Sequence, residues 1–343
     1  MDINDVIFSP AQAIATTDEH LAERRHAQET GGLQVGMPCY IDGLDATRRE
    51  DDRGLLPILD GDLCSIIARP GHGKTSFMMW WARKRVEHIR HRAAMGDEDA
   101  ARRVVVYISM EQTIEALKSF HIAARNKEYR LSVTRMAQGK ISPEQWDAIQ
   151  RANTMQSADP LWFMGHSVER KAKRVRLTVP VIAEALWNIE NWQGEQNKFR
   201  IDSVFVDYLQ RLPYEKKESK TVGVSDNLDN LKQIGMELVT KMVTGVQARR
   251  ECDQRDDPTP GEDDGQWTSN IEQSSDTLIT LVRPCKYKEQ GGTFAGVTVE
   301  GYSQMRVTVP KQKMGESNFD KWVEFDPRYN ELTEGELTTY DLN

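Results

Sequence analysis

Runs of β-branched and other apolar residues, separated by stretches with helical spacing, dominate the middle of the chain. Five runs are expected to be strands, most of them buried on both faces: 65–68, 104–110, 203–210, 242–247 and 277–284. Helical spacing predicts helices from 75 onward, over about 113–125, near 143–155 and over 178–192. This alternation predicts an α/β fold, a doubly wound and mainly parallel twisted sheet flanked by helices.

The two ends of the chain follow other patterns. Residues 9–28 are mostly polar, with Pro10 near the start, and predict a helix whose apolar stripe is too thin to form a core alone. Near the other end, segments 296–302, 305–310 and 322–327 alternate apolar and polar residues, which predicts antiparallel strands added at the sheet edge. We therefore expect an N-terminal arm over 1–31 and one large domain over 32–343.

Composition narrows the class of protein. The 45 Lys and Arg residues against 53 Asp and Glu give a net charge of −8, which excludes a protein that grips nucleic acid with its whole surface but allows a local basic channel. The four cysteines have no pairing or metal-ligand spacing, as in a reduced compartment. Because no run of about 18 apolar residues and no leader pattern occurs, we expect a cytoplasmic protein without a membrane partner.

The segment SIIARPGHGKTSF, residues 65–77, lies at a strand-to-helix turn and matches the P-loop pattern. Ala68 stands where the first glycine is usual, but the part from Gly71 to Thr75 is intact, and its N–H groups would face phosphate. We expect Lys74 to reach the β and γ phosphates of ATP and Thr75 to hold Mg²⁺. The predicted nucleotide contacts are Arg69, Pro70, Gly71, His72, Gly73, Lys74, Thr75 and Ser76. A chance glycine turn is the alternative.

Three further side chains follow predicted strands directly. Because ligands collect at the carboxyl ends of parallel strands, Glu111, Asp207 and Gln247 are expected to meet the P-loop at one edge of the sheet. Asp207 would orient Mg²⁺, Glu111 would polarise an attacking water, and Gln247 would sense the γ phosphate. For either acid alone, a surface carboxylate is an equally common interpretation.

Five segments in order, ARPGHGKTSF, VVYISMEQ, VFVDYLQRL, VQARRE and SNIEQSSDTLITLVRP, resemble the motifs of the RecA-like ATPase domain of DnaB-type replicative helicases. The resemblance spans about 32–330 and assigns Glu111, Asp207 and Gln247 the same roles. It implies a RecA-like P-loop NTPase fold and a ring, usually of six subunits, that hydrolyses ATP to move on single-stranded DNA and unwind duplex during replication. Because about 31 residues precede the resemblance, we expect this sequence to lack the family's N-terminal domain.

The resemblance also implies contacts between subunits and with other proteins. The arm would act as the linker helix that docks on the next subunit, and a primase or a loader is a candidate partner in a bacterial or phage-infected cell. Basic residues would enter each ATP site from the adjacent subunit, and their match is Lys311 and Lys313. Lys313 stands where the family has arginine, and a lysine cannot make the bidentate contact to phosphate that an arginine makes. Without the resemblance, these are two same-face residues on an exposed strand.

DNA is expected to pass along the loops that follow the Asp207 and Gln247 strands. The predicted contacts are Lys216, Lys217, Lys220, Arg249, Arg250, Gln266 and Trp267. Gln266 stands where the family usually has an arginine, and Trp267 either stacks on a base or packs its own loop. The alternative function is an ATP-switched assembly or loading ATPase that binds DNA without separating strands.

Overall fold

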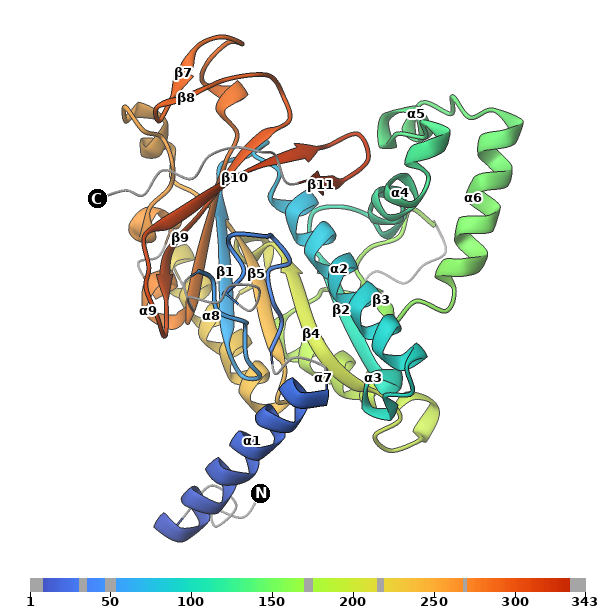
Figure 1. Ribbon diagram of the computed structural model, residues 1–343, viewed down its shortest axis with the longest axis vertical. Coiled ribbons are helices and arrows are strands. Elements are labelled where there is room, and N and C mark those ends of the chain that lie inside the picture. Colours follow the sequence, from blue (N-terminus) through green and yellow to red (C-terminus); the bar gives the residue numbers. More distant parts are fainter. Residues whose placement is uncertain are drawn as a thin grey trace.

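Continuous runs of β-branched residues form the centre of the protein, a sheet of nine strands between two layers of helices (Figure 1). The computed structural model describes residues 9–30, 36–46, 54–169, 175–214, 219–267 and 270–333. Strand order across the sheet is β11-β10-β9-β6-β1-β5-β4-β2-β3. The strands are β1 (Leu63–Ala68), β2 (Arg103–Ser109), β3 (Leu161–Met164), β4 (Arg200–Asp207), β5 (Lys241–Gln247), β6 (Thr277–Val282), β9 (Gln304–Gln312), β10 (Phe319–Asp326) and β11 (Glu331–Thr333).

The six strands from β6 to β3 are parallel, and β9, β10 and β11 complete the sheet as antiparallel neighbours. Since β9 reverses direction and β10 reverses it again, β10 runs the same way as β1. The carboxyl end of β10 therefore lies at the same edge of the sheet as the P-loop. The predicted RecA-like α/β architecture, mainly parallel with added antiparallel strands, is confirmed.

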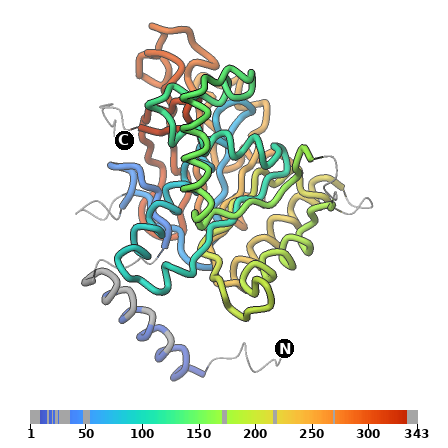
Figure 2. Tube along the Cα trace, turned by 90° about the vertical axis from the view of Figure 1, so that its right-hand side faces the viewer, coloured from blue at the N-terminus to red at the C-terminus, as the bar shows by residue number. Residues whose placement is uncertain are grey.

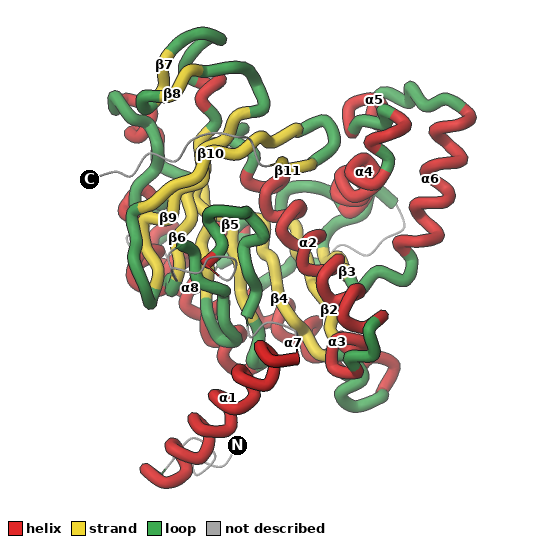
Figure 3. The backbone as a smooth tube through the Cα atoms, viewed as in Figure 1, coloured by secondary structure: helices red, strands yellow, loops and turns green. Residues whose placement is uncertain are grey.

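Helices cover both faces of the sheet (Figure 3). The helices are α1 (Pro10–Thr30), α2 (Lys74–Ala94), α3 (Glu98–Arg102), α4 (Ile114–Arg125), α5 (Val133–Ala137), α6 (Pro143–Gln156), α7 (Val179–Glu190), α8 (Lys220–Glu237) and α9 (Asn270–Ser274). Strand side chains alternate between two cores: Tyr107 of β2 packs on the α2 side, and Val106 packs on the side of α7 and α8. Of the helices described, none is both long and apolar enough to cross a membrane.

Helix α2 is anchored by large aromatic side chains. Phe77, Trp80 and Trp81 are at most 1% exposed, and the Trp81 indole donates to the Pro38 carbonyl at 2.8 Å. Full burial of each such side chain contributes on the order of 2 kcal/mol. This packing fixes the helix whose first residue is Lys74. Helix α1, in contrast, projects from the body of the molecule in both views (Figures 1 and 2).

Most elements expected from the sequence are confirmed, with three corrections. The strand predicted over 203–210 is β4, which starts earlier and ends at Asp207, because 209–211 form a 3-10 turn. The loop after this strand was expected over 211–226, but α8 begins at Lys220, capped by the Ser219 side chain. Segment 296–302 adds no strand to the sheet edge; it contributes β8 (Val297–Thr298), which pairs only with β7 (Thr293–Phe294). Strand β3 and helix α8 were not predicted.

A buried ion cluster ties α2 to the parallel strands. Arg85 of α2 forms two 2.7 Å contacts with the Asp202 carboxylate of β4. Arg103 of β2 donates to the same carboxylate at 2.9 Å, and Lys241 of β5 lies 3.8 Å from it. Burial opposes ionisation, but these cations hold the pKa of Asp202 well below its ordinary value. Asp202 is therefore the carboxylate that these three cations share, although Arg103 also pairs with Asp99 and Lys241 with Asp60.

Asp202→Asn should destabilise the protein by about 3–5 kcal/mol, because it leaves the buried Arg85 guanidinium without its carboxylate partner. The matched control is Asp99→Asn, which removes a carboxylate that also pairs with Arg103 but whose side chain is 38% exposed. That change should cost less than about 1 kcal/mol. Urea unfolding followed by circular dichroism measures both variants, and equal costs would contradict the assignment.

Candidate nucleotide-binding site

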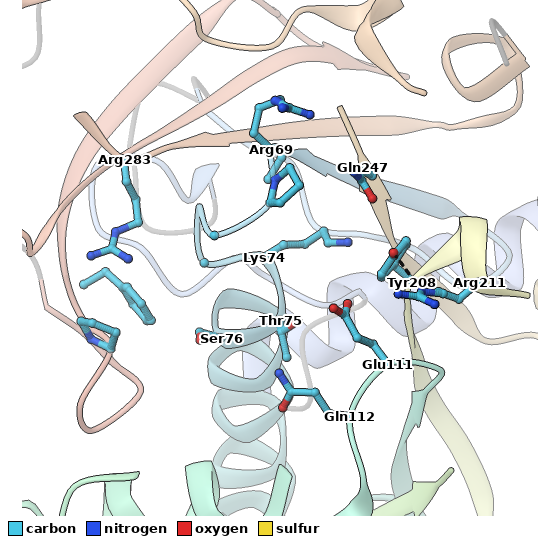
Figure 4. A pocket seen from close by; sticks show the side chains of 16 residues that line it. Arg69, Lys74, Thr75, Ser76, Glu111, Gln112, Tyr208, Arg211, Gln247 and Arg283 are labelled. Carbon is cyan, nitrogen blue, oxygen red and sulfur yellow. Dashed lines mark hydrogen bonds between the residues drawn. The ribbon is translucent and has the colours of Figure 1, made fainter. Parts of the chain in front are cut away.

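A cleft of about 490 Å³ lies at the carboxyl edge of the parallel strands. The P-loop lines its centre, and the ends of β2, β4, β5 and β10 supply further walls (Figure 4). Among its residues are Lys74, Thr75, Glu111 and Gln247, so the structure brings together side chains expected from separate segments of the chain. Asp207 lies directly behind this cleft, in contact with Lys74.

The P-loop needs glycine at two positions. Gly71 and Gly73 have φ angles of +79° and +90°, which side chains of L-residues rarely adopt. A Cβ at Gly73 would also lie 2.8 Å from the Met305 methyl carbon. Because α2 begins at Lys74, its unpaired N–H groups and the positive end of its dipole face the cleft.

Lys74 and Asp207 form the buried floor of the site. The Lys74 ammonium lies 3.9 Å from Asp207 Oδ1 and 3.8 Å from the centroid of the Tyr208 ring. Burial lowers the pKa of Lys74 to about 8, against the opposing effect of Asp207 and Glu111. Lys74 therefore loses its proton more easily than an ordinary lysine, and a bound anion would raise its pKa again.

The residues present fit Mg²⁺. The Tyr107 hydroxyl donates to Asp207 Oδ2 at 3.2 Å, whereas Oδ1 is buried and has no hydrogen-bond partner among the described residues. Burial, reinforced by Asp207, raises the pKa of Tyr107 well above its ordinary value, so this tyrosine remains a donor. An unsatisfied carboxylate oxygen beside the P-loop, together with the Thr75 hydroxyl, is the hard oxygen chemistry that Mg²⁺ prefers.

Glu111 is presented by a fixed turn. The Ser109 hydroxyl bonds both the N–H and the carbonyl of Gln112, at 2.9 and 2.8 Å, and the Met110 N–H donates to the Asp207 carbonyl at 2.7 Å. This turn leaves Glu111 exposed at the pocket wall, facing Thr75 (Figure 4). The position of Glu111 is therefore fixed by hydrogen bonds to the ends of β2 and β4.

Gln247 is tied to both loops that follow β4 and β5. The Gln210 side chain accepts from the Gln247 N–H at 3.1 Å and donates to the Gln266 carbonyl at 3.3 Å. The Gln266 N–H in turn donates to the Gln247 carbonyl at 2.9 Å. A shift of Gln247 would therefore move both loops.

Two of the predicted nucleotide contacts have side chains that bind other parts of the protein. The Arg69 guanidinium binds Asp253 at 2.9–3.2 Å and the Ala248 carbonyl at 3.0 Å. His72 accepts from the Arg283 N–H at 3.0 Å and is absent from the cleft wall, and burial lowers its pKa to about 4. His72 therefore lies outside the cleft, whereas Arg69 still lines it with its guanidinium bound to protein groups (Figure 4).

Several wall residues were not predicted. Tyr208 and Arg211 come directly after Asp207, so the rule of strand ends could have found them. Arg283 forms the other end of the cleft (Figure 4), and Phe325 and Pro327 also line the cleft. The last two depend on the direction of β10, which the sequence does not reveal. A guanidinium beside apolar surface suits a flat aromatic base.

The structure places Lys311 and Lys313 at the opposite end of the sheet. Lys311 donates to the Glu272 carbonyl, and Lys313 lies 3.5 Å from Asp62 and 3.4 Å from Asp276, which precede β1 and β6. The six residues of β1 span about 20 Å from this end of the sheet to the P-loop. Neither lysine therefore reaches the P-loop cleft of its own chain.

Of the predicted DNA contacts, Lys220 and Trp267 touch each other. The Lys220 ammonium lies 3.2 Å from the centroid of the Trp267 ring, which packs against the core beside α8. Arg249 donates to the Gly265 carbonyl at 3.1 Å, and Arg250 is exposed. Gln266 Oε1 is buried and has no hydrogen-bond partner within the described ranges. Lys216 and Lys217 lie outside the described residues.

Comparison with known proteins agrees with this arrangement. The family model described as DnaB-like helicase C terminal domain matches residues 43–334. The replicative DNA helicase DnaB of Helicobacter pylori is 25% identical over 263 residues, 76% of this chain and 46% of that protein. The Rickettsia typhi DnaB helicase is 21% identical over 259 residues, 75% of this chain and 48% of that protein. The chain spans about half the length of these relatives.

Solved structures share the fold. One solved ATPase domain aligns with a TM-score of 0.69 and 19% identity, over 93% of this chain and 98% of that one. A DnaB-like replicative helicase, solved with its interactions with primase, aligns with a TM-score of 0.63 and 20% identity, over 81% of this chain and 59% of that one. Since the family model covers most of the chain, the protein belongs to the family of DnaB-like helicase C-terminal domains.

Proposed function

We propose that this chain is the ATPase motor of a ring-forming DNA helicase, which hydrolyses ATP to move on single-stranded DNA and unwind duplex during replication. One observation carries the proposal. The P-loop, Glu111, Asp207 and Gln247 converge on a single cleft, and the loops that follow two of their strands are joined through Gln210. A hydrolysis site is thus coupled to a second surface that is suited to a moving ligand.

Each residue has a chemical part in this proposal. The P-loop amides and Lys74 bind the phosphates, and Thr75 and Asp207 hold Mg²⁺. Bound Mg²⁺ supplies positive charge at the phosphate oxygens as the γ phosphate is transferred. Glu111 orients the attacking water and draws its proton. Gln247 reports the loss of the γ phosphate to the two loops through its contacts with Gln210 and Gln266.

We further propose that single-stranded DNA binds along those loops. Lys216, Lys217, Lys220, Arg249 and Arg250 would supply charge for its phosphates. The Trp267 ring is already covered by Lys220 on one face and packs on the core, which favours a supporting role over base stacking. Gln266 would contribute its backbone link to Gln247 rather than a charged contact.

Active sites would form between copies of the chain. Lys311 and Lys313 lie at the far end of the sheet from their own P-loop, so only another copy can receive them at its nucleotide. This supports a homo-oligomer, for which six subunits are expected from the family. Residues 1–31 would act as an arm for the next subunit, since α1 projects from domain 32–343 with Ile14 and Leu21 exposed (Figure 1).

The partners and the location follow from the relatives. A DnaB-like helicase aligned above is described with its interactions with primase, so a primase or a loader is proposed to dock on this ring. Because the curated relatives are bacterial replicative helicases, we propose that the protein acts in the cytoplasm of a bacterial or phage-infected cell.

A second function is an ATP-switched assembly or loading ATPase that binds DNA without separating strands. Two observations favour it. Lys313 stands in place of an arginine and pairs with Asp62 and Asp276, and Gln266 offers no charge to DNA. The first would weaken stimulation of hydrolysis by the neighbouring subunit, and the second would weaken the grip on DNA that strand separation requires.

Strand separation decides between the two functions. With ATP and Mg²⁺, the protein should separate a forked DNA duplex, and single-stranded DNA should stimulate its ATPase. Lys74→Ala should abolish both activities, because it removes the cation that binds the phosphates. A fluorescent strand-displacement assay, with mass measurement of the ATP-bound assembly, provides the readout. ATP-dependent DNA binding without displacement would establish the loading function instead.

Glu111→Gln should keep nucleotide affinity within about threefold and lower the hydrolysis rate by about 10²–10⁴-fold, because it removes a proton acceptor but not a phosphate contact. The control is Glu115→Gln, which changes an exposed acid one turn further on that binds Ser167 instead of facing the cleft. Turnover and the affinity for a fluorescent ATP analogue separate the two effects. Normal hydrolysis in Glu111→Gln would remove this residue from its role.

Nucleotide binding should take up protons at alkaline pH. Because burial lowers the Lys74 pKa to about 8, this side chain is mostly neutral at about pH 8.5, and phosphate would restore its charge. Titration calorimetry in buffers of different ionisation enthalpy should detect roughly 0.7 proton per site at pH 8.5 and almost none at pH 6.5. Lys74→Arg, which does not titrate in this range, should take up none; equal uptake by both proteins would contradict the assignment.

A further inference from the structure

We propose that Arg211 is an additional catalytic residue, a guanidinium that each subunit supplies to the γ-phosphate end of its own ATP cleft. This inference rests on the proposed hydrolysis of ATP at that cleft. It concerns a residue to which the family motifs quoted above assign no role, and it identifies a cation in cis where the expected cations act in trans.

Arg211 reaches the cleft because of the turn after β4. The strand ends at Asp207, and the 3-10 turn Leu209–Arg211 folds the chain back over the strand end. Arg211 consequently lines the cleft on the same wall as Tyr208, with Glu111 close by (Figure 4). This is the end of the cleft at which Lys74 and Glu111 meet, opposite the end formed by Arg283.

Tyr208 positions the guanidinium. Arg211 Nε donates to the Tyr208 hydroxyl at 3.1 Å, and its central carbon lies 5.9 Å from the ring centroid. Within the described residues, the two terminal nitrogens have no protein hydrogen-bond partner. Those two nitrogens form the edge of the fork that binds phosphate oxygens in pairs. The same tyrosine ring carries Lys74 at 3.8 Å, so one side chain places two cations.

The charge balance of the site favours this role. At the subunit interface, Lys313 stands in the place of a family arginine, and an ammonium cannot form the planar paired contact of a guanidinium. Arg211 supplies that missing chemistry from within the chain. Its hydrogen bond to Tyr208, with Glu111 nearby, raises the pKa of Arg211 above its ordinary value, so the fork stays charged.

Arg211→Ala should lower kcat for ATP by about 10- to 100-fold while nucleotide affinity changes by less than about threefold, because the contact forms mainly in the transition state. Arg211→Lys should recover only part of the rate. The matched control is Arg151→Ala: Arg151 donates to the Tyr129 hydroxyl at 3.2 Å and lies 5.7 Å from its ring, on α6, away from the cleft. That variant should hydrolyse ATP at the normal rate.

A mixing experiment tests the assignment in cis. Arg211→Ala and Lys74→Ala chains are mixed before assembly, and co-assembly is verified by native mass measurement. If Arg211 serves its own subunit, no site in the mixed ring has both cations. Because the Lys74→Ala sites contribute nothing, activity per chain should then fall to about half the Arg211→Ala level in an equal mixture. If it serves the neighbour, activity rises above that level and the proposal in cis is overturned. Lys313→Ala mixed with Lys74→Ala is the matched pair for a residue that acts in trans.

The remaining outcomes also decide the matter. An unchanged kcat in Arg211→Ala would overturn the inference and leave the proposed ATPase intact. Weaker binding of single-stranded DNA with a normal basal kcat would overturn it too, because Arg211 would then be a DNA contact of the loop after β4. Absence of hydrolysis in the unaltered protein would instead reject the proposed function, on which the inference rests.

Discussion

The buried carboxylate of Asp202 is the contact on which the geometry of the site depends. It joins four elements: α2 through Arg85 near the middle of the helix, β2 through Arg103, β5 through Lys241, and its own strand β4. Ends of these four elements carry Lys74, Glu111, Gln247 and Asp207. The ion cluster therefore joins the four elements whose ends carry the proposed catalytic groups at the opposite edge of the sheet.

The sequence was sufficient to predict the features that depend on local order. A strand, a glycine turn and a helix that opens on Lys74 identify the P-loop, and the rule that parallel strands end together brings Glu111, Asp207 and Gln247 to it. Side-chain directions within the P-loop were not predictable, because Arg69 is bound by Asp253 and His72 by Arg283, residues about 180 and 210 positions away. Such partners depend on tertiary packing.

Other features required the sheet topology. Phe325 lies in the cleft only because β9 and β10 reverse direction twice, and the helical start at Lys220 depends on a cap from Ser219 that a polar loop sequence conceals. The separate hairpin of β7 and β8 forms because Phe294 packs on Trp322 and Tyr287, a small cluster that competes with addition to the main sheet. In each case a long-range contact overrides the local alternation.

The electrostatics of the cleft suggest why its parts act together. Lys74 and Arg211 lie beside one tyrosine ring, and burial lowers the pKa of Lys74 although Asp207 and Glu111 oppose that shift. The negative charge of a bound triphosphate would stabilise the protonated form of Lys74, and loss of the γ phosphate would remove part of that stabilisation. Because Tyr208 and Arg211 belong to the segment that leads into the loop after β4, a change in phosphate charge acts directly on that loop, in parallel with the contacts of Gln247. The same segment can therefore sense the nucleotide and displace a ligand without a separate relay element.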